Sequence, residues 1–176
     1  NDAHTLYAFG LARALLEAHP EADAAVVLPA ILLHDIGWSQ VPPAEVLQAI
    51  APGGGRPDLV LLHEKEGARL AAGILAEAGY DAGKVPAVLD IIDGHDSRRE
   101  AISIEDAIVK DADKTWRLSP HGIDTVMDWF GLDRGQAGRQ LLGAPEAVRP
   151  VLLQGLPEDR AQVGGDPLRG IADREV

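Results

Sequence analysis

A His-Asp pair lies where a strongly apolar stretch of the sequence ends. The pair is His34-Asp35, and it follows the run VVLPAILL and precedes Gly37. Helical phase places His34 on the same inward face as Ala30 and Ile31, where two polar groups cost several kcal/mol unless they are satisfied. A His-Asp dipeptide is common by chance, so the pair alone is equally consistent with a satisfied structural pair and with metal ligands.

Three further histidines favour the second interpretation. Each lies at or near the end of a predicted helix and in phase with its apolar residues: His4, His63 and His95. One such histidine is usually a core residue, but four of them, accompanied by acids, need hydrogen-bond partners or a metal. His19 is explained as an exposed helix cap before Pro20, and His121 is left out because it opens a helix.

The acidic candidates come from the segment KDADK, residues 110–114. It could be a solvated charge cluster. Against that, Asp113 shares a helical face with Val109 and Trp116, so it points where apolar residues point. Asp111 is in phase with other apolar residues, and helical phase does not choose between the two acids.

The elements that carry these residues are all predicted helices. Alanine and leucine abound, aromatic residues make up 4% of the chain, and no stretch alternates with a period of two. We expect an all-α fold, a compact bundle of about six to eight helices. The predicted helices span residues 6–18, 21–36, 40–50, 59–78, 84–94, 104–118 and 121–130, with one or two short ones in 131–154.

One domain is predicted over residues 1–154. Residues 51–58 form a Gly/Pro-rich loop, and residues 155–176 are polar and rich in Gly, Pro, Asp and Arg. That composition favours an extended or partly disordered tail.

Charge and cysteine content limit the function classes. Sixteen basic and 28 acidic residues give a net charge of −12, which argues against nucleic acid and an anionic membrane as partners. A phosphorylated small-molecule substrate stays possible, because a bound metal supplies local positive charge. Without cysteine, any metal must be bound by nitrogen and oxygen. No apolar run reaches roughly 18 residues and no signal peptide is visible, so we expect a cytoplasmic protein.

The order His4, His34-Asp35, Asp113 resembles the HD superfamily of metal-dependent phosphohydrolases, an all-helical family that uses an early His, a His-Asp pair and a late Asp as metal ligands. The string SIEDAIVKDADK is similar to the closing segment of that family. By this resemblance Asp113 is a better candidate ligand than Asp111.

Two more segments resemble the branches of the family that hold two metals. HEKEGARLAAGIL is similar to their His-x-x-x-Gly-Ala helix, and IIDGHDS to their later Ile-x-x-His. The resemblance, which covers roughly residues 1–118, implies His63 and His95 as further ligands, with Asp35 bridging the metals. Trp38 stands where the cyclic-dinucleotide-cleaving branch has Lys and where the diiron oxygenase branch often has His, which makes the first activity unexpected and weakens the second.

The resemblance implies a phosphohydrolase acting on a nucleotide or another small phosphate ester, with one or two ions of Fe, Mn, Co, Ni or Zn. The alternatives are a diiron oxygenase on a small organophosphonate or polyol-like substrate and a non-catalytic regulatory module. Asp35 and Lys114 are predicted to be catalytic, and Asp96 to be a general base or to support a ligand, although it could also cap a helix.

Substrate contacts are predicted from basic residues close in sequence to the ligands, although each is also plausible as a surface charge. Lys114 and Arg98 are preferred because each nearly adjoins a ligand, and Lys65 and Arg117 are further candidates. Trp38 is expected either to wall the pocket or to fill the core.

Overall fold

Side-chain caps begin several of the helices in the computed structural model, which describes residues 2–51 and 55–143. Asp23 accepts a hydrogen bond from the backbone N–H of Ala25 at 2.9 Å, and Ser103 and Ser119 cap later helices in the same way. Such caps satisfy N–H groups that have no partner inside the helix. The cap at Asp23 explains why the helix predicted to begin at residue 21 begins at Ala24.

The described residues form eight α-helices and a 3₁₀-helix, η1, with no strand among them, which confirms the predicted all-α fold. The elements are α1 (Asp2–Ala18), α2 (Ala24–Leu33), η1 (Ile36–Gln40), α3 (Pro43–Ala49), α4 (Pro57–Glu77), α5 (Val85–Ile92), α6 (Ile104–Trp116), α7 (Pro120–Phe130) and α8 (Arg134–Gly143). The predicted tail, residues 155–176, and the end of the predicted domain lie outside the described residues. None of these helices combines the length and apolarity needed to cross a membrane.

The prediction of one helix over residues 21–36 was wrong at its end. Helix α2 stops at Leu33, and the chain turns into η1. The reason lies at Gly37, which packs against the backbone of α4, so that a Cβ there would lie 1.8 Å from the carbonyl oxygen of His63. Only glycine allows this approach. The turn therefore brings the residues around Asp35 onto α4.

The helix predicted over residues 84–94 also ends early, at Ile92. Gly94 has φ +145°, a backbone conformation that residues with a side chain rarely adopt, and the chain continues in turns through Ser97. His95 therefore lies in a turn after α5 rather than at the end of a helix.

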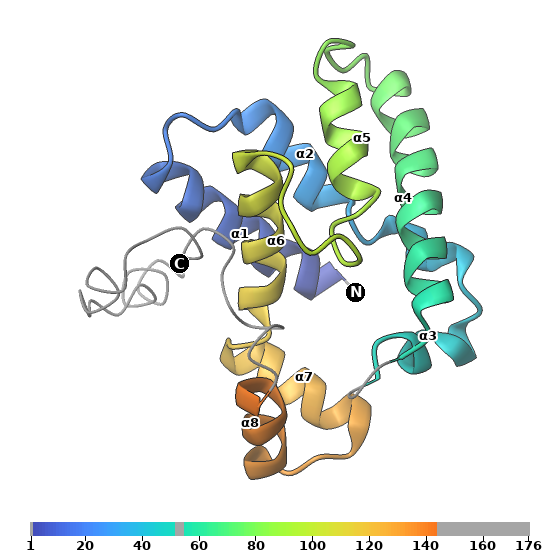
Figure 1. Ribbon diagram of the computed structural model, residues 1–176, viewed down its shortest axis with the longest axis vertical. Coiled ribbons are helices and arrows are strands. Elements are labelled where there is room, and N and C mark those ends of the chain that lie inside the picture. Colours follow the sequence, from blue (N-terminus) through green and yellow to red (C-terminus); the bar gives the residue numbers. More distant parts are fainter. Residues whose placement is uncertain (1, 52–54, 144–176) are drawn as a thin grey trace.

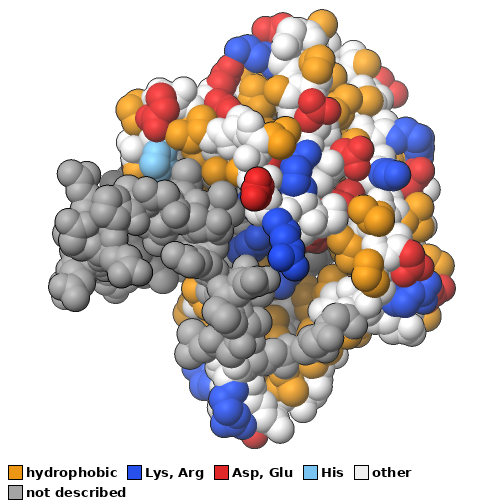
Figure 2. Space-filling view, in the orientation of Figure 1, with side chains coloured by type: hydrophobic (Ala, Val, Ile, Leu, Met, Phe, Trp, Pro, Cys, Tyr) orange, Lys and Arg blue, Asp and Glu red, His pale blue; other side chains and the backbone are white. Residues whose placement is uncertain are grey.

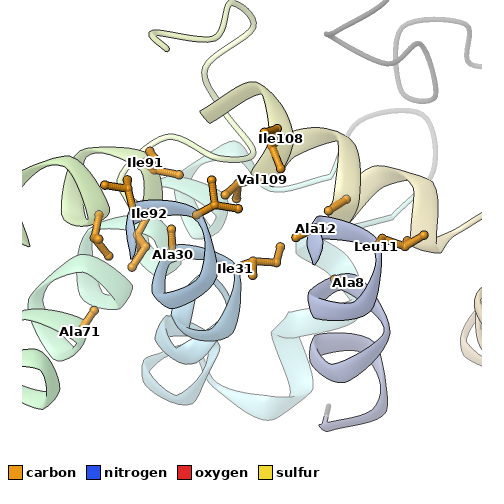
Figure 3. Packing of buried hydrophobic residues seen from close by; sticks show 14 of the residues in the cluster. Ala8, Leu11, Ala12, Ala30, Ile31, Ala71, Ile91, Ile92, Ile108 and Val109 are labelled. Atoms are coloured by element: carbon orange, nitrogen blue, oxygen red, sulfur yellow. The ribbon is translucent and has the colours of Figure 1, made fainter. Parts of the chain in front are cut away.

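A core of mainly aliphatic side chains joins α1, α2, α4, α5 and α6, whose arrangement Figure 1 shows. Ile31, Ile108 and Val109 are completely buried, and Figure 3 shows them between the helices with Ala8 and Ala12. Truncating an isoleucine in such a core to alanine costs about 2–5 kcal/mol. A smaller cluster of Val41, Ala49 and Leu59, with Trp38 packed on it, joins η1 and α3 to α4.

Candidate metal centre

His4 lies in the first turn of α1, because this helix begins at Asp2 rather than at the predicted Leu6. Its ring is buried and stands edge-on to the indole of Trp116, with the ring centroids 4.4 Å apart. Helix α1 packs along α6, which carries Trp116. The core packing of two helices therefore fixes the position of His4.

Two of the histidines are oriented by the helices that precede them. His34 Nδ1 donates a hydrogen bond to the carbonyl of Ile31 at 2.7 Å, and His95 Nδ1 donates one to the carbonyl of Ile92 at 2.9 Å. With the proton on Nδ1, the Nε2 atom of a neutral ring carries the lone pair. Metal-binding histidines are commonly oriented in this way.

The first group of donor atoms joins α1, α2 and α6. His4 Nε2 lies 3.1 Å from His34 Nε2, 3.2 Å from Asp35 Oδ2 and 3.2 Å from Asp113 Oδ1. His34 Nε2 lies 3.5 Å from each of the same two carboxylate oxygens. Of the two acids that the sequence left open, Asp113 is the one that the structure places in this group, which we call the first group: His4, His34, Asp113 and Asp35 Oδ2.

The second group joins α4 to the turn after α5. His63 Nε2 and His95 Nε2 lie 3.3 Å apart. Each is 3.8 Å from Asp96 Oδ2 and 3.9 Å from Asp35 Oδ1. We call His63, His95, Asp96 and Asp35 Oδ1 the second group. The two oxygens of Asp35 thus face different groups, so this one carboxylate lies between them.

The donor set fits divalent transition metals. Imidazole nitrogen and carboxylate oxygen are ligands that such ions accept, and sets of three or more donors lie within 4.8 Å of one another in both groups. Two imidazole nitrogens bound to one ion at about 2.0–2.1 Å would lie roughly 3.0–3.4 Å apart. The Nε2–Nε2 distances of 3.1 Å and 3.3 Å fall within that interval.

The electrostatics of the first group also favour a cation. Burial alone would lower the pKa of His4 and His34, but hydrogen bonds and Coulomb attraction from Asp113 and Asp35 outweigh it and raise the pKa to about 9 and about 10. Burial likewise opposes ionisation of Asp35 and Asp113, yet the two histidines hold the pKa of both carboxyls well below the usual value. The two carboxylates therefore create a negative electrostatic potential at the first group, and bound protons or a metal ion would stabilise them.

In the second group, the pKa of one histidine is lowered rather than raised. Burial lowers the pKa of His63, and Coulomb repulsion from His95 lowers it further. A neutral imidazole is the form that binds metal. Trp38 stacks on the His63 ring with the centroids 3.8 Å apart and donates its indole N–H to Asp35 Oδ1 at 2.9 Å. Because the buried Nδ1 of His63 has no hydrogen-bond partner among the described residues, stacking orients this ring.

Comparison with known families adds an independent observation. The family model of the HD domain matches residues 1–118, about two thirds of the chain. The chain belongs to the HD domain family. Every residue of both donor groups lies within the matched range. Searches of curated proteins and of solved structures gave no match.

A buried polar clamp behind the second group escaped the sequence analysis of this HD domain. Glu64 Oε1 accepts hydrogen bonds at 2.8 Å from the backbone N–H groups of Asp96 and Ser97. Lys110 Nζ donates to the carbonyls of Gly94 and His95 at 2.5 Å and 3.0 Å. The two side chains therefore hold the 94–97 turn from two sides, and we call them the Glu64–Lys110 clamp.

Both clamp residues are fully buried, and their surroundings shift their ionisation. Burial lowers the pKa of Lys110, an effect that its ion pair with Asp106 at 3.3 Å only partly offsets. Burial would raise the pKa of Glu64, but hydrogen bonds from Ser97 and Asp96 outweigh it and lower the pKa. The position of Glu64 next to His63, and the lysine directly after the apolar run of residues 107–109, were the available sequence signals.

The basic residues predicted to contact substrate are placed differently from one another. Lys65 is exposed on α4, and Lys114 is half-buried next to Asp113. Arg98 is bound to groups outside the two donor groups: its guanidinium donates to the carbonyl of Asp90 at 2.8 Å and lies 3.5 Å from Asp106. None of these three lines the cavity described next, whereas Arg117 does. Their substrate roles stay predictions.

A cavity of about 750 Å³ opens onto the donor groups, within the roughly 300–1,000 Å³ usual for small-molecule sites. His4, Asp35, Asp96 and Asp113 form its metal-facing wall. Trp38 lines it as well, so this indole both walls the cavity and packs on the smaller hydrophobic cluster. Donor atoms and cavity together form a site where a small molecule could reach a metal ion held by the donor atoms.

Proposed function

We propose that this HD domain is a metal-dependent phosphohydrolase that cleaves a small phosphate monoester. Water adds to phosphorus and the ester P–O bond breaks, so that R–O–PO₃²⁻ and H₂O give R–OH and HPO₄²⁻. The observation that carries the proposal is the carboxylate of Asp35, whose two oxygens face two separate groups of histidine and aspartate donors at one wall of a cavity.

Two divalent ions fit this arrangement. His4, His34 and Asp113 would hold one, His63 and His95 the other, and Asp35 would bridge them. Such ions lower the pKa of a coordinated water and polarise a phosphoryl oxygen. The nitrogen and oxygen donors suit Fe, Mn, Co, Ni or Zn, among which availability decides.

Protein groups at the cavity supply the other functions. Asp96 lies in the second group, is partly exposed and lines the cavity, which supports a role for its Oδ2 in accepting the proton of the attacking water. Arg117, at the same cavity, offers a guanidinium that binds phosphate oxygens in pairs. Trp38 covers the His63 ring and keeps water from that side of the second group.

A second candidate is a diiron oxygenase on the same scaffold. It is favoured by the same mixed imidazole and carboxylate donor set with a shared aspartate, which also suits iron redox chemistry. Iron content together with oxygen consumption in the presence of an organophosphonate distinguishes it from a hydrolase.

Elemental analysis of the purified protein tests the proposal, with His34→Ala, His63→Ala and His95→Ala beside the wild type. We expect about two ions per wild-type chain, about one in His63→Ala and His95→Ala, and hydrolysis of phosphate monoesters by the loaded wild type only. One ion that is kept in both second-group variants contradicts the two-ion site. Absence of metal under every loading condition contradicts an enzyme and favours a non-catalytic helical module.

A further inference from the structure

The cavity concentrates the aromatic residues of a chain that has few of them. Aromatic residues make up 4% of the sequence, with three tryptophans, two phenylalanines and two tyrosines. All three tryptophans, Trp38, Trp116 and Trp129, line this one cavity, and Phe130 lies beside them. Aromatic side chains offer large rigid apolar surfaces to a ligand.

Aliphatic side chains complete the wall away from the metal-facing residues. Helix α3 contributes Val46 and Leu47, with Ile50 directly after it, and α7 contributes Val126. Leu47 is 40% exposed although it is a large hydrophobic residue. In Figure 2, hydrophobic side chains lie in the hollow between the regions of α3 and α7, below a group of Lys and Arg side chains. The organic part of a ligand in this cavity would therefore contact mainly apolar surface.

Positive charge is scarce by comparison. Arg117 is the only lysine or arginine among the described residues that line the cavity, while Asp35, Asp96 and Asp113 contribute carboxylates. The whole chain carries a net charge of −12. Each further phosphate adds about one to two negative charges that need cationic partners. The described wall has no partner for a second or third phosphate.

We propose, on the basis of the function proposed above, that the preferred substrates are phosphate monoesters with an apolar organic group. The single phosphate lies between the donor groups and Arg117, and the organic group lies among the tryptophans, Phe130 and the α3 side chains. Hydrolysis then releases an apolar alcohol and inorganic phosphate. Nucleoside di- and triphosphates are poor substrates, because the described wall beyond the donor groups offers their additional phosphates one arginine and no lysine.

A series of straight-chain alkyl phosphates tests this on the metal-loaded full chain. Ethyl, butyl and hexyl phosphate have leaving groups of nearly equal reactivity, so differences in kcat/KM report contacts with the alkyl chain. We expect kcat/KM to rise about threefold for each added CH₂ group, close to 100-fold from ethyl to hexyl, and then to level off once the cavity is filled. A nucleoside triphosphate should be hydrolysed more slowly than hexyl phosphate.

The outcomes separate the two proposals. Hydrolysis with no dependence on chain length, or a preference for triphosphates, overturns the substrate class and leaves the phosphohydrolase standing. Absence of hydrolysis for every ester contradicts the proposed phosphohydrolase. The preference of the cavity for an apolar group is then tested by ligand binding alone.

Binding is measured with alkylphosphonates, which have no ester bond to cleave, through the fluorescence of the three tryptophans. Hexylphosphonate should bind at least tenfold more tightly than ethylphosphonate, and equal affinity overturns the proposal. Leu47→Ala should lower this ratio about threefold. Leu61→Ala is the matched control, since Leu61 is 45% exposed on α4 and does not line the cavity. Arg117→Ala should weaken both phosphonates equally.

Discussion

The two donor groups differ in what holds them in place. The first group lies on helices of the main core, and its histidines contact carboxylate oxygens at 3.2–3.5 Å. The second group is looser, with His–Asp distances of 3.8–3.9 Å, and half of it lies on a turn held by the Glu64–Lys110 clamp. Apolar packing thus positions one group and buried hydrogen bonds position the other.

This difference implies different vulnerabilities. A change in the aliphatic core would disturb the first group and the stability of the fold together, because the same helices serve both. The second group can be disturbed through its clamp or through the indole that stacks on His63, with the rest of the bundle in place. Only Asp35 is shared by the two groups.

Asp35→Ala should have the largest effect, because it removes the carboxylate that contacts both groups. We expect both ions to be lost and turnover to fall by at least about 10³-fold, since several kcal/mol of transition-state stabilisation come from bound metal. Metal content by elemental analysis and the hydrolysis rate measure this. Circular dichroism serves as the control for folding, and a variant that keeps one full ion would show that the groups are independent.

Asp113→Ala and Asp111→Ala compare two neighbouring buried acids of α6. Only Asp113 has its carboxylate oxygen in the first group, so only its loss should remove the ion held there, with turnover reduced at least about 10²-fold. Metal counts on the two variants decide between the acids. If Asp111→Ala lost the ion while Asp113→Ala kept it, the assignment of the first group would be wrong.

Lys110→Met should destabilise the protein by up to about 3–5 kcal/mol, because it leaves the buried Asp106 carboxylate with Arg98, 3.5 Å away, as its one remaining ion-pair partner among the described residues. Urea unfolding of the metal-free protein measures this free energy. The double variant Lys110→Met with Asp106→Leu removes both charges and should be more stable than Lys110→Met alone. Equal stability of the single and double variants would mean that the ion pair is not what stabilises this region.

Glu64→Ala should lower the metal affinity of the second group about 10–100-fold and leave the first group unchanged, as is usual for residues that orient ligands. Glu64→Gln is the matched variant. Its amide oxygen still accepts the N–H groups of Asp96 and Ser97, so we expect an affinity within about threefold of wild type. Competitive metal titration measures both, and equal losses would place the effect in the charge of Glu64 rather than in its hydrogen bonds.

Trp38→Phe should give the smallest effect. The phenyl ring can still stack on His63, but the hydrogen bond to Asp35 is lost. A hydrogen bond to a charged acceptor contributes about 1.5–3 kcal/mol, which corresponds to roughly 10–100-fold in metal affinity if no water replaces the lost donor. With water replacing that donor, we expect a loss of about tenfold at the second group. Trp38→Ala removes the stacking too and should lose more; indistinguishable titrations of the two variants would show that stacking does not orient His63.

The helical fold was predictable from the sequence, and so were most of the residues that the structure brings together in the two donor groups. Alanine and leucine content predicted helices, and four histidines placed at helix ends among apolar residues could be singled out because a buried imidazole needs a partner. The boundaries were less predictable. The break after Leu33 depends on how closely Gly37 approaches α4, a contact between segments 26 residues apart that no local pattern contains.

The sequence by itself thus determined which residue types could bind metal, and the tertiary structure decided which of them meet. Helical phase could not separate Asp111 from Asp113, because α6 is packed on nearly all sides and both acids are buried. Proximity in sequence to a ligand favoured Arg98, yet its guanidinium turns to Asp90 and Asp106 while Arg117, from the end of α6, lines the cavity. The roles of Glu64 and Lys110 could be identified only from their hydrogen-bond partners on the 94–97 turn. A buried charged group needs such partners, and here they come from another segment of the chain.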